Sequence, residues 1–189
     1  MSVFLHIGFH KTGSTALQSW LGDNADGLRE TGVWVPQVGC PPGKRYHRLL
    51  TTELEEGHGK QWAEFETGWA SSGCRDAVLS DERLSAPWYP ESSMRMLKDC
   101  LAPHKVTIVA YIRNPVDYFF SRYRHSIKMD AINSHWSLRR FIRERVPSSN
   151  EYLGQLDSWA RVFGRENVLL GIYEQAVTES SVAESFCEI

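Results

Sequence analysis

The chain has 189 residues, of which 42% are apolar and 23% charged, and its formal net charge is −2. This length is enough for one domain with a sizeable core, and the composition is that of an ordinary globular protein. The near-neutral charge excludes a general electrostatic attraction to nucleic acid or to an anionic membrane, so any anion site must be local.

The cysteines of the chain are far apart and form no CxxC pair, so the sequence shows neither the ligand spacing of a zinc site nor a disulfide framework. The N-terminus lacks a basic segment followed by a long apolar run, and no stretch approaches the length of a transmembrane helix. We therefore expect a cytoplasmic protein that binds no metal or nucleic acid and crosses no membrane. The cysteines are Cys40, Cys74, Cys100 and Cys187.

The N-terminal residues predict a strand, a tight loop and a helix in direct succession. Residues 3–7 are an apolar run, and the loop from Gly8 to Gly13 leads into a helix that continues to about residue 21. The N-terminus of such a helix favours an anion, because its backbone N–H groups and its dipole point there. The Gly8-x4-Gly13 spacing is that of a P-loop, but Ser14 follows the second glycine and the lysine, Lys11, lies within the loop.

The middle of the chain alternates between helical and strand patterns. Residues 25–30 predict a short helix, residues 33–35 a short strand, and residues 47–56 and 60–69 two further helices. Residues 77–79 predict a third strand, which leads directly into Ser80, Asp81 and Glu82. Strands that alternate with helices are typical of parallel sheets.

The second half of the chain continues this alternation. Residues 92–101 predict a helix, and the apolar, β-branched run at 105–112 predicts a central parallel strand covered on both faces. Asn114 suits the cap of a helix and Pro115 its first position, so a helix begins there. Two more helices and a last strand are expected at residues 137–146, 152–163 and 167–173.

These elements predict a three-layer, P-loop-like α/β fold, with a mainly parallel central sheet flanked by helices, in a single domain over residues 1–189. In such folds ligands bind at the carboxyl ends of the strands. Three separate segments reach that edge, namely the loop at residues 8–15, the turn at residues 80–82 and the segment at residues 113–121. We expect them to form one site.

Two of these segments resemble a known family. His6 to Thr15, followed by Leu17 and Gln18, resembles the 5′-phosphosulfate loop of sulfotransferases and is most similar to the bacterial and Golgi-type members. The run from Arg113 to Tyr123 resembles the 3′-phosphate segment of the same family. The likeness covers nearly the whole chain, and the two motifs occur in the family's order.

The resemblance implies transfer of a sulfuryl group from 3′-phosphoadenosine 5′-phosphosulfate (PAPS) to an acceptor hydroxyl or amine by in-line displacement, without a metal. Lys11 would offset charge on the departing 5′-phosphate, and Arg113 and Ser121 would bind the 3′-phosphate. The role of His10 is open between a contact to the donor and an exposed loop residue. The donor-binding residues implied are His10, Lys11, Thr12, Gly13, Ser14, Thr15, Arg113 and Ser121.

The general base is open at this point. Glu82 is the first choice by likeness to family members with a glutamate there, His47 the second because imidazole titrates near neutrality, and Asp81 the third. The acceptor is also open between a glycan, a lipid and a small-molecule alcohol, and Trp88 is a candidate for its pocket. The alternatives are a P-loop nucleotide kinase or triphosphatase, against which Ser14 speaks, and a non-catalytic nucleotide-binding relative.

The C-terminal residues 185–189 lie within what reads as an unfinished amphipathic helix. Members of the resembled family usually continue beyond this point with a loop that contacts the donor. A chain truncated at the C-terminus is therefore one expectation, and a naturally short chain is the other.

Overall fold

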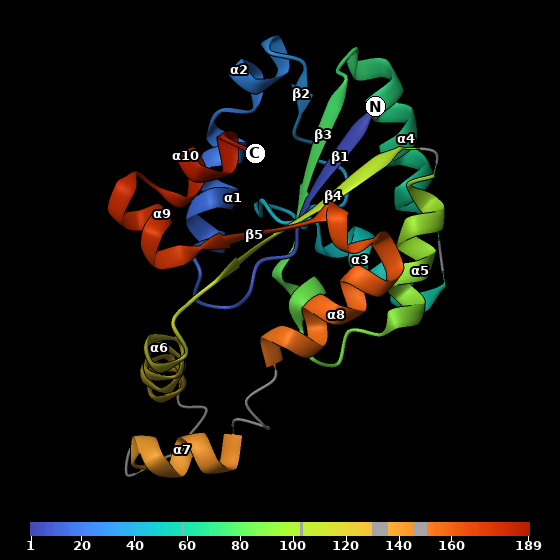
Figure 1. Ribbon diagram of the computed structural model, residues 1–189. Helices are drawn as coiled ribbons and strands as arrows, with labels where there is room; N and C mark the ends of the chain where they lie inside the picture. Colours follow the sequence, from blue (N-terminus) through green and yellow to red (C-terminus); the bar gives the residue numbers. More distant parts are fainter. Residues whose placement is uncertain (58, 103, 130–135, 146–150) are drawn as a thin grey trace.

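The computed structural model describes residues 1–57, 59–102, 104–129, 136–145 and 151–189 (Figure 1). Its core is one sheet of parallel strands in the order β2-β3-β1-β4-β5. β1 lies in the middle, with His6 beside Ser80 of β3 and Val109 of β4. The strands are β1 (Ser2–His6), β2 (Val33–Trp34), β3 (Asp76–Ser80), β4 (Lys105–Ile112) and β5 (Val168–Ile172). The prediction of an α/β fold is confirmed, and the described strands are all parallel rather than mainly so.

Helices connect and cover these strands. The α-helices are α1 (Ser14–Asp23), α2 (Ala25–Glu30), α3 (Arg48–Glu56), α4 (Lys60–Ser72), α5 (Glu91–Cys100), α6 (Pro115–Lys128), α7 (Leu138–Arg145), α8 (Glu151–Phe163), α9 (Tyr173–Glu179) and α10 (Val182–Cys187). The short 3-10 helices are η1 (Glu82–Ser85) and η2 (Arg165–Asn167). The end predicted for the helix at residue 146 lies outside the described residues.

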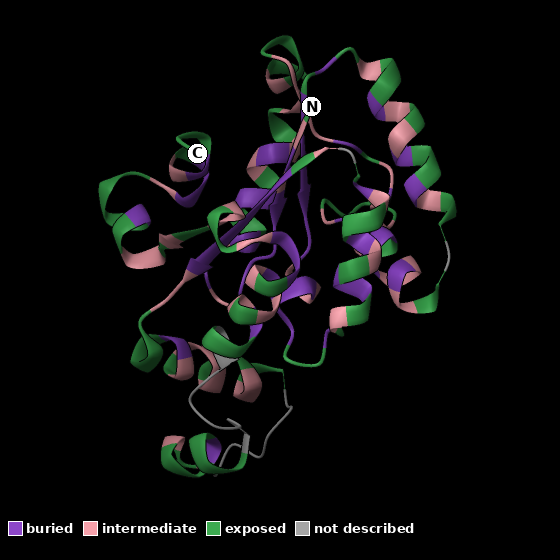
Figure 2. Cartoon of the chain, turned by 45° about the vertical axis from the view of Figure 1, so that its right-hand side comes forward, coloured by how far each residue is buried: buried purple, intermediate pink, exposed green. Residues whose placement is uncertain are grey.

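The two faces of the sheet carry separate apolar clusters, and in Figure 2 the strands are largely buried between the helices. One face packs against α3, α4, α5 and α8 and includes Phe65, Trp69 and Trp159. The other packs against α1 and α10. Successive residues of β4 alternate between the faces, as the two-residue period of a strand requires, which explains why its residues from Val106 to Ile112 are apolar except Thr107.

The carboxyl ends of β1, β3 and β4 meet at one edge of the sheet, and the polar segments of the chain follow them there (Figure 1). The loop after β1 leads into α1, Asp81 and η1 follow β3, and α6 follows β4. α6 and α7 lie beyond this edge, below the sheet in Figure 1. Within the described ranges, no helix combines the length and apolarity needed to cross a membrane.

The last part of the chain differs from the predicted elements. β5 ends at Ile172, and Tyr173, predicted as the end of that strand, begins α9. α9 has one buried residue, Ala176, so it lacks the apolar stripe by which a helix is recognised in a sequence. The helix predicted to run through residues 185–189 is observed as α10, which begins at Val182, ends at Cys187 and packs against α1.

Candidate functional site

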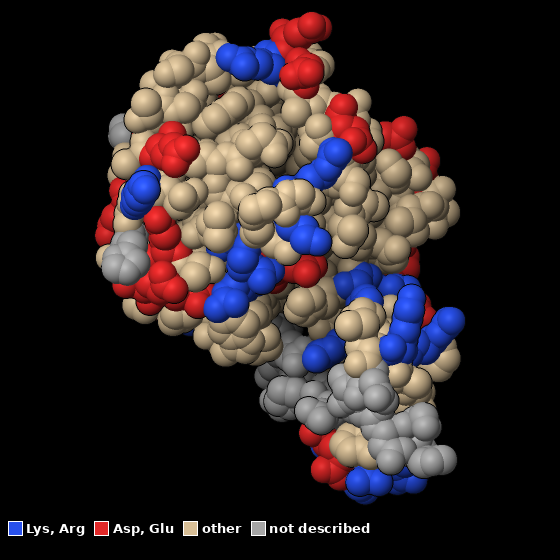
Figure 3. Space-filling view, turned by 180° about the vertical axis from the view of Figure 1, so that it is seen from behind, with Lys and Arg blue, Asp and Glu red and all other residues tan. Residues whose placement is uncertain are grey.

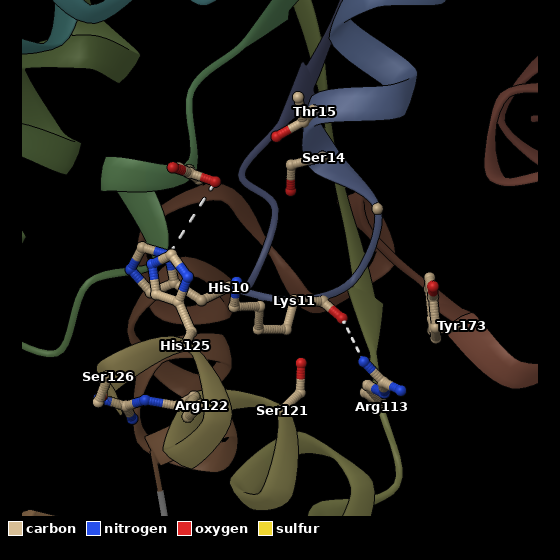
Figure 4. Close-up of a pocket in the computed structure, with 12 residues that line it drawn as sticks. His10, Lys11, Ser14, Thr15, Arg113, Ser121, Arg122, His125, Ser126 and Tyr173 are labelled. Carbon is tan, nitrogen blue, oxygen red and sulfur yellow. Dashed lines mark hydrogen bonds and ion pairs between the residues drawn. The ribbon is translucent and has the colours of Figure 1, made fainter. Parts of the chain in front are cut away.

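A cavity of about 630 Å³ opens at the carboxyl edge of the sheet (Figure 4). The β1–α1 loop forms one wall and α6 the opposite one, and Arg113 and Tyr173 close one end (Figure 4). Glu82 lines the cavity beside His10. It is lined by His10, Lys11, Gly13, Ser14, Thr15, Glu82, Arg113, Ser121, Arg122, His125, Ser126 and Tyr173. The three segments expected to converge therefore do share one cavity.

The β1–α1 loop owes its shape to left-handed backbone at Gly8, Lys11 and Gly13, with φ of 20°, 67° and 83°. Lys11 is the non-glycine residue among them, and this conformation is uncommon for a side chain with a β-carbon. At Gly8 an added β-carbon would collide with Ser14 Oγ and lie 2.6 Å from Cε1 of His6. The loop therefore needs glycine at Gly8, which lets its backbone approach the start of α1.

Thr12 lies outside the cavity lining, unlike its neighbours. Its side chain is fully buried, and its hydroxyl donates a hydrogen bond of 2.6 Å to the carbonyl of Phe9. This bond closes the loop on itself and leaves the start of α1 facing the cavity. The Thr12 side chain thus shapes the loop, whereas the side chains of Ser14 and Thr15 reach the cavity (Figure 4).

A hydrogen-bond network lies directly beneath this loop. Nδ1 of His6 is 2.8 Å from the hydroxyl of Ser80, and Nε2 of Gln18 donates to the same hydroxyl at 3.1 Å. Burial lowers the pKa of His6 to about 4, so its ring is neutral at physiological pH. Among the described residues, Nε2 of His6 and the hydroxyl of Ser14 have no hydrogen-bond partner, although both atoms are buried.

The opposite wall is one face of α6. Asn114 accepts a hydrogen bond of 2.9 Å from the N–H of Val116, and Pro115 follows it, so the helix begins as its sequence predicts. Ser121 and three residues that the sequence interpretation did not assign to the site line the cavity from this helix, and Ser121 and His125 point toward the loop (Figure 4). They are Arg122, His125 and Ser126. His125 and Ser126 lie four and five residues after Ser121, and this helical spacing was the signal that they share its face, whereas Arg122 is its immediate neighbour.

Arg113 connects the loop to α9. Its Nη1 donates to the carbonyl of Lys11 at 3.0 Å, and its Nε lies 3.6 Å from a carboxylate oxygen of Glu174. The guanidinium also stacks over the ring of Tyr173, 4.9 Å from the ring centre. Tyr173 and Glu174 begin α9, whose presence the sequence interpretation missed, and so their place beside Arg113 was missed as well.

Positive charge is concentrated on this side of the molecule, although the chain as a whole is slightly acidic. Figure 3 shows Lys and Arg side chains over the part formed by α6 and α7. These helices carry Arg122, Arg124, Lys128, Arg139, Arg140 and Arg143. Together with Lys11 and Arg113, they create a local positive potential that suits an anionic ligand.

The pKa of His125 offers a test of this geometry. It is lowered from its ordinary value, chiefly by the charge of Lys11 and further by burial, Lys128 and His10. We expect Lys11→Met to raise the pKa of His125, because removal of a nearby cation makes protonation of the imidazole easier. An NMR titration of the His125 ring measures this, and Lys128→Met should raise the value less. An unchanged value in Lys11→Met would mean that the ammonium group does not face α6.

His47 is not brought to the cavity. It is buried, its Nδ1 accepts from the N–H of Ser80 at 3.0 Å, and its Nε2 donates to the carbonyl of Pro36 at 3.0 Å. Burial lowers its pKa, and both ring nitrogens are occupied by the backbone. This arrangement fits a histidine that holds the loop at residues 36–47 to β3, and it does not favour one that takes a proton from a substrate.

Asp81 is fully buried and lies outside the cavity as well. Its carboxylate accepts from Nε and Nη2 of Arg48 at 3.0 Å, from the hydroxyl of Thr51 at 2.6 Å and from the N–H of Arg83 at 3.0 Å. The last bond caps η1. These contacts fix the turn after β3 and so direct the next side chain, Glu82, toward the cavity.

We expect Asp81→Asn to lower the free energy of unfolding by about 3 kcal/mol, because the buried partner of a guanidinium is removed. Urea denaturation measures this change. Glu91→Gln, which removes an ion pair with arginines on the surface, is the control and should change stability little. An Asp81→Asn variant of wild-type stability would contradict this structural role of Asp81.

A second cavity, of about 410 Å³, adjoins the first. The two share His10, Glu82 and Arg122, and Nδ1 of His10 lies 4.0 Å from the carboxylate of Glu82. The second cavity is bordered by Trp88, which is 60% exposed and carries the guanidinium of Arg83 4.5 Å above its ring. Glu82 and His10 therefore line both cavities, at the place where the two cavities meet.

In the part of the chain that the structure describes, no group of three His, Cys, Asp or Glu side chains is placed to hold a metal ion. No family model and no curated protein matches the chain. Among solved structures, it is similar to a sulfotransferase from Alicyclobacillus acidocaldarius, with a TM-score of 0.55 and 18% identity over 93% of this chain and 74% of that one. The fold is thus that of a sulfotransferase, and the resemblance seen in the sequence is confirmed at the level of the fold.

Two further similar structures are of retinol dehydratase. One is a complex with androsterone and the inactive cofactor PAP, at 15% identity, and the other a complex with retinol and PAP, at 16% identity. Both have a TM-score of 0.43, and each alignment covers 94% of this chain. The chain spans little more than half the length of these two proteins, 55% and 56%.

Proposed function

We propose that this protein is a sulfotransferase, which transfers the sulfuryl group of PAPS to an acceptor hydroxyl or amine by in-line displacement. The observation that carries the proposal is the pairing of two anion-binding groups in one cavity. Lys11 and the start of α1 lie on one side of this cavity, and Arg113 and Ser121 line it from a distant segment of the chain. A nucleotide with phosphates at both its 5′ and 3′ positions matches two such groups.

The residues present fit a tetrahedral anion at the start of α1. The hydroxyl of Ser14 is buried without a partner and lines the cavity, and the first N–H groups of α1 lie beside it. A buried polar atom without a partner is costly, and a bound phosphate would satisfy it. Ser14 also stands where a nucleoside triphosphatase has its phosphate-binding lysine, which favours a donor without a magnesium–triphosphate group.

Under this proposal each cavity residue has a definite task. Lys11 stabilises negative charge on the oxygen that leaves with the 5′-phosphate, while the N–H groups at residues 12–15 and the hydroxyls of Ser14 and Thr15 hold that phosphate. Arg113 and Ser121 hold the 3′-phosphate, and Arg113 also fixes the loop through the carbonyl of Lys11. PAPS supplies the activated sulfuryl group.

Glu82 is our candidate for the base that takes the proton of the acceptor. It lies at the junction of the two cavities, whereas His47 and Asp81 are engaged elsewhere. The second cavity, with Trp88 at its border, is then the entrance for the acceptor. A glycan, a lipid and a small-molecule alcohol all remain acceptor classes within this proposal.

Calorimetry on the intact chain tests the proposal. We expect 3′-phosphoadenosine 5′-phosphate (PAP) to bind at one site per chain and more tightly than adenosine 5′-phosphate, which lacks the 3′-phosphate. Ser121→Ala should weaken PAP binding roughly tenfold, the size of one hydrogen bond to a charged group, and leave adenosine 5′-phosphate unaffected. Undetectable binding of PAP, or stronger magnesium-dependent binding of ATP, would overturn the proposal.

A further inference from the structure

Two buried polar atoms lie beside Gly8 beneath the β1–α1 loop, and the proposed reaction does not account for one of them, Nε2 of His6. The His6 side chain is 0% exposed and that of Ser14 is 4% exposed. Among the described residues, Nε2 of His6 and Oγ of Ser14 are both without a hydrogen-bond partner. Both lie against Gly8, since a β-carbon there would collide with the serine hydroxyl and lie 3.0 Å from Nε2.

The neighbouring hydrogen bonds define which nitrogen of His6 carries its proton. Gln18 donates to the hydroxyl of Ser80, so an electron pair of that oxygen is used. The hydrogen of the Ser80 hydroxyl then needs an acceptor, and Nδ1 of His6, at 2.8 Å, is the acceptor that the structure provides. Nδ1 is therefore unprotonated, and the neutral ring carries its proton on Nε2, on the side of Ser14.

We propose that His6 is a positioning residue, which directs its Nε2–H toward the oxygen of Ser14 and so orients the Ser14 hydroxyl as a hydrogen-bond donor to an anion in the loop. The donors follow in the order Gln18, Ser80, His6 and Ser14. No proton is transferred along this series. In the structure Gln18 donates to the hydroxyl of Ser80, and that hydroxyl donates to Nδ1 of His6. The proposal adds a hydrogen bond from Nε2–H of His6 to Ser14, formed when the Ser14 hydroxyl turns to the bound anion, and such chains strengthen their terminal donor.

This role explains two features of the sequence. Gln18 follows Ser14 by four residues, so both lie on the face of α1 that is turned to the loop and β3. Gly8 lacks the side chain that would separate His6 from Ser14. The inference rests on the proposed function only in the identity of the anion, which would be the 5′-phosphate of the donor.

The tautomer of His6 is the first test and requires no ligand. Nitrogen-15 NMR of the imidazole rings distinguishes a proton on Nε2 from one on Nδ1. We expect Nε2–H for His6 in the free protein. His47 is an internal reference, because its Nε2 donates to the carbonyl of Pro36. A proton on Nδ1 of His6 would overturn the proposal, whether or not the protein is a sulfotransferase.

A double-mutant cycle is the second test. We expect Ser14→Ala and His6→Phe each to weaken PAP binding about tenfold, and the double variant to bind no worse than Ser14→Ala. A merely structural role for His6 would instead give multiplied losses, near 100-fold. Ser80→Ala serves where His6→Phe does not fold, and its loss should likewise disappear in the Ser14→Ala background.

The outcomes separate the two proposals. If wild-type protein does not bind PAP, the sulfotransferase proposal fails. The tautomer of His6 still tests the proposal that His6 orients Ser14. If PAP binds and the losses multiply, the proposal for His6 fails while the sulfotransferase proposal stands.

Discussion

Lys11→Ala is expected to reduce the rate of sulfuryl transfer at saturating donor by about 10²–10³-fold, the loss typical for one charge-stabilising donor in an active site. The charge on the leaving phosphate oxygen grows as the bond to sulfur breaks, so an ammonium group beside it acts mainly in the transition state. The Michaelis constant for PAPS should change much less than the turnover number. Steady-state kinetics with a competent acceptor measures both.

Alanine is an informative replacement at this position. Lys11 has a φ of 67°, and alanine has the same steric penalty there, so the change removes the ammonium group without relaxing the loop. Lys128→Ala is the matched control, because both lysines act on the pKa of His125 but only Lys11 lines the cavity. We expect the control to change the rate less than about twofold. If the transfer rate fell equally in the two variants, Lys11 would contribute only to the general positive potential and would have no specific role in the transition state.

The elements that the sequence predicted best are those with an unambiguous pattern. β4 was predicted at its observed bounds, because residues 106–111 are all buried and Thr107 is the one polar residue among them, so the apolar, β-branched run is clear. β5 is an edge strand with exposed Leu170 and Ile172, and its predicted end was one residue too long. α9 was missed because its single buried residue, Ala176, leaves no periodic pattern to recognise.

The residues predicted for the site also fall into two groups, those placed by a general rule of the fold and those placed by contacts between distant parts of the chain. The convergence of the loop, Glu82 and the segment from Arg113 to Ser121 followed from the rule that strand ends meet at one edge, and they share the cavity. The position of His47 depends on hydrogen bonds to Pro36 and to Ser80, 33 residues further along the chain. No local pattern encodes such contacts, so a histidine near a predicted site could not be distinguished from one that supports the fold.

Glu82→Gln should have the second large effect, a decrease of the turnover number by about 10²–10⁴-fold, as is typical when a general base is removed. The amide keeps the size of the side chain but cannot take the proton of the acceptor. Binding of PAP should be unchanged or tighter, because a carboxylate that lines a cavity for an anion repels that ligand. This opposite effect on turnover and on binding distinguishes a base from a donor-binding residue.

Calorimetry with PAP and single-turnover transfer from labelled PAPS measure the two quantities separately. His10→Gln is the comparison, because His10 lies 4.0 Å from Glu82 and also lines both cavities. We expect this variant to retain most of the activity if the imidazole only assists Glu82. If His10→Gln lost turnover and Glu82→Gln did not, His10 rather than Glu82 would be the base. A Glu82→Gln variant that loses PAP binding and turnover together would contradict the role of Glu82 as the base.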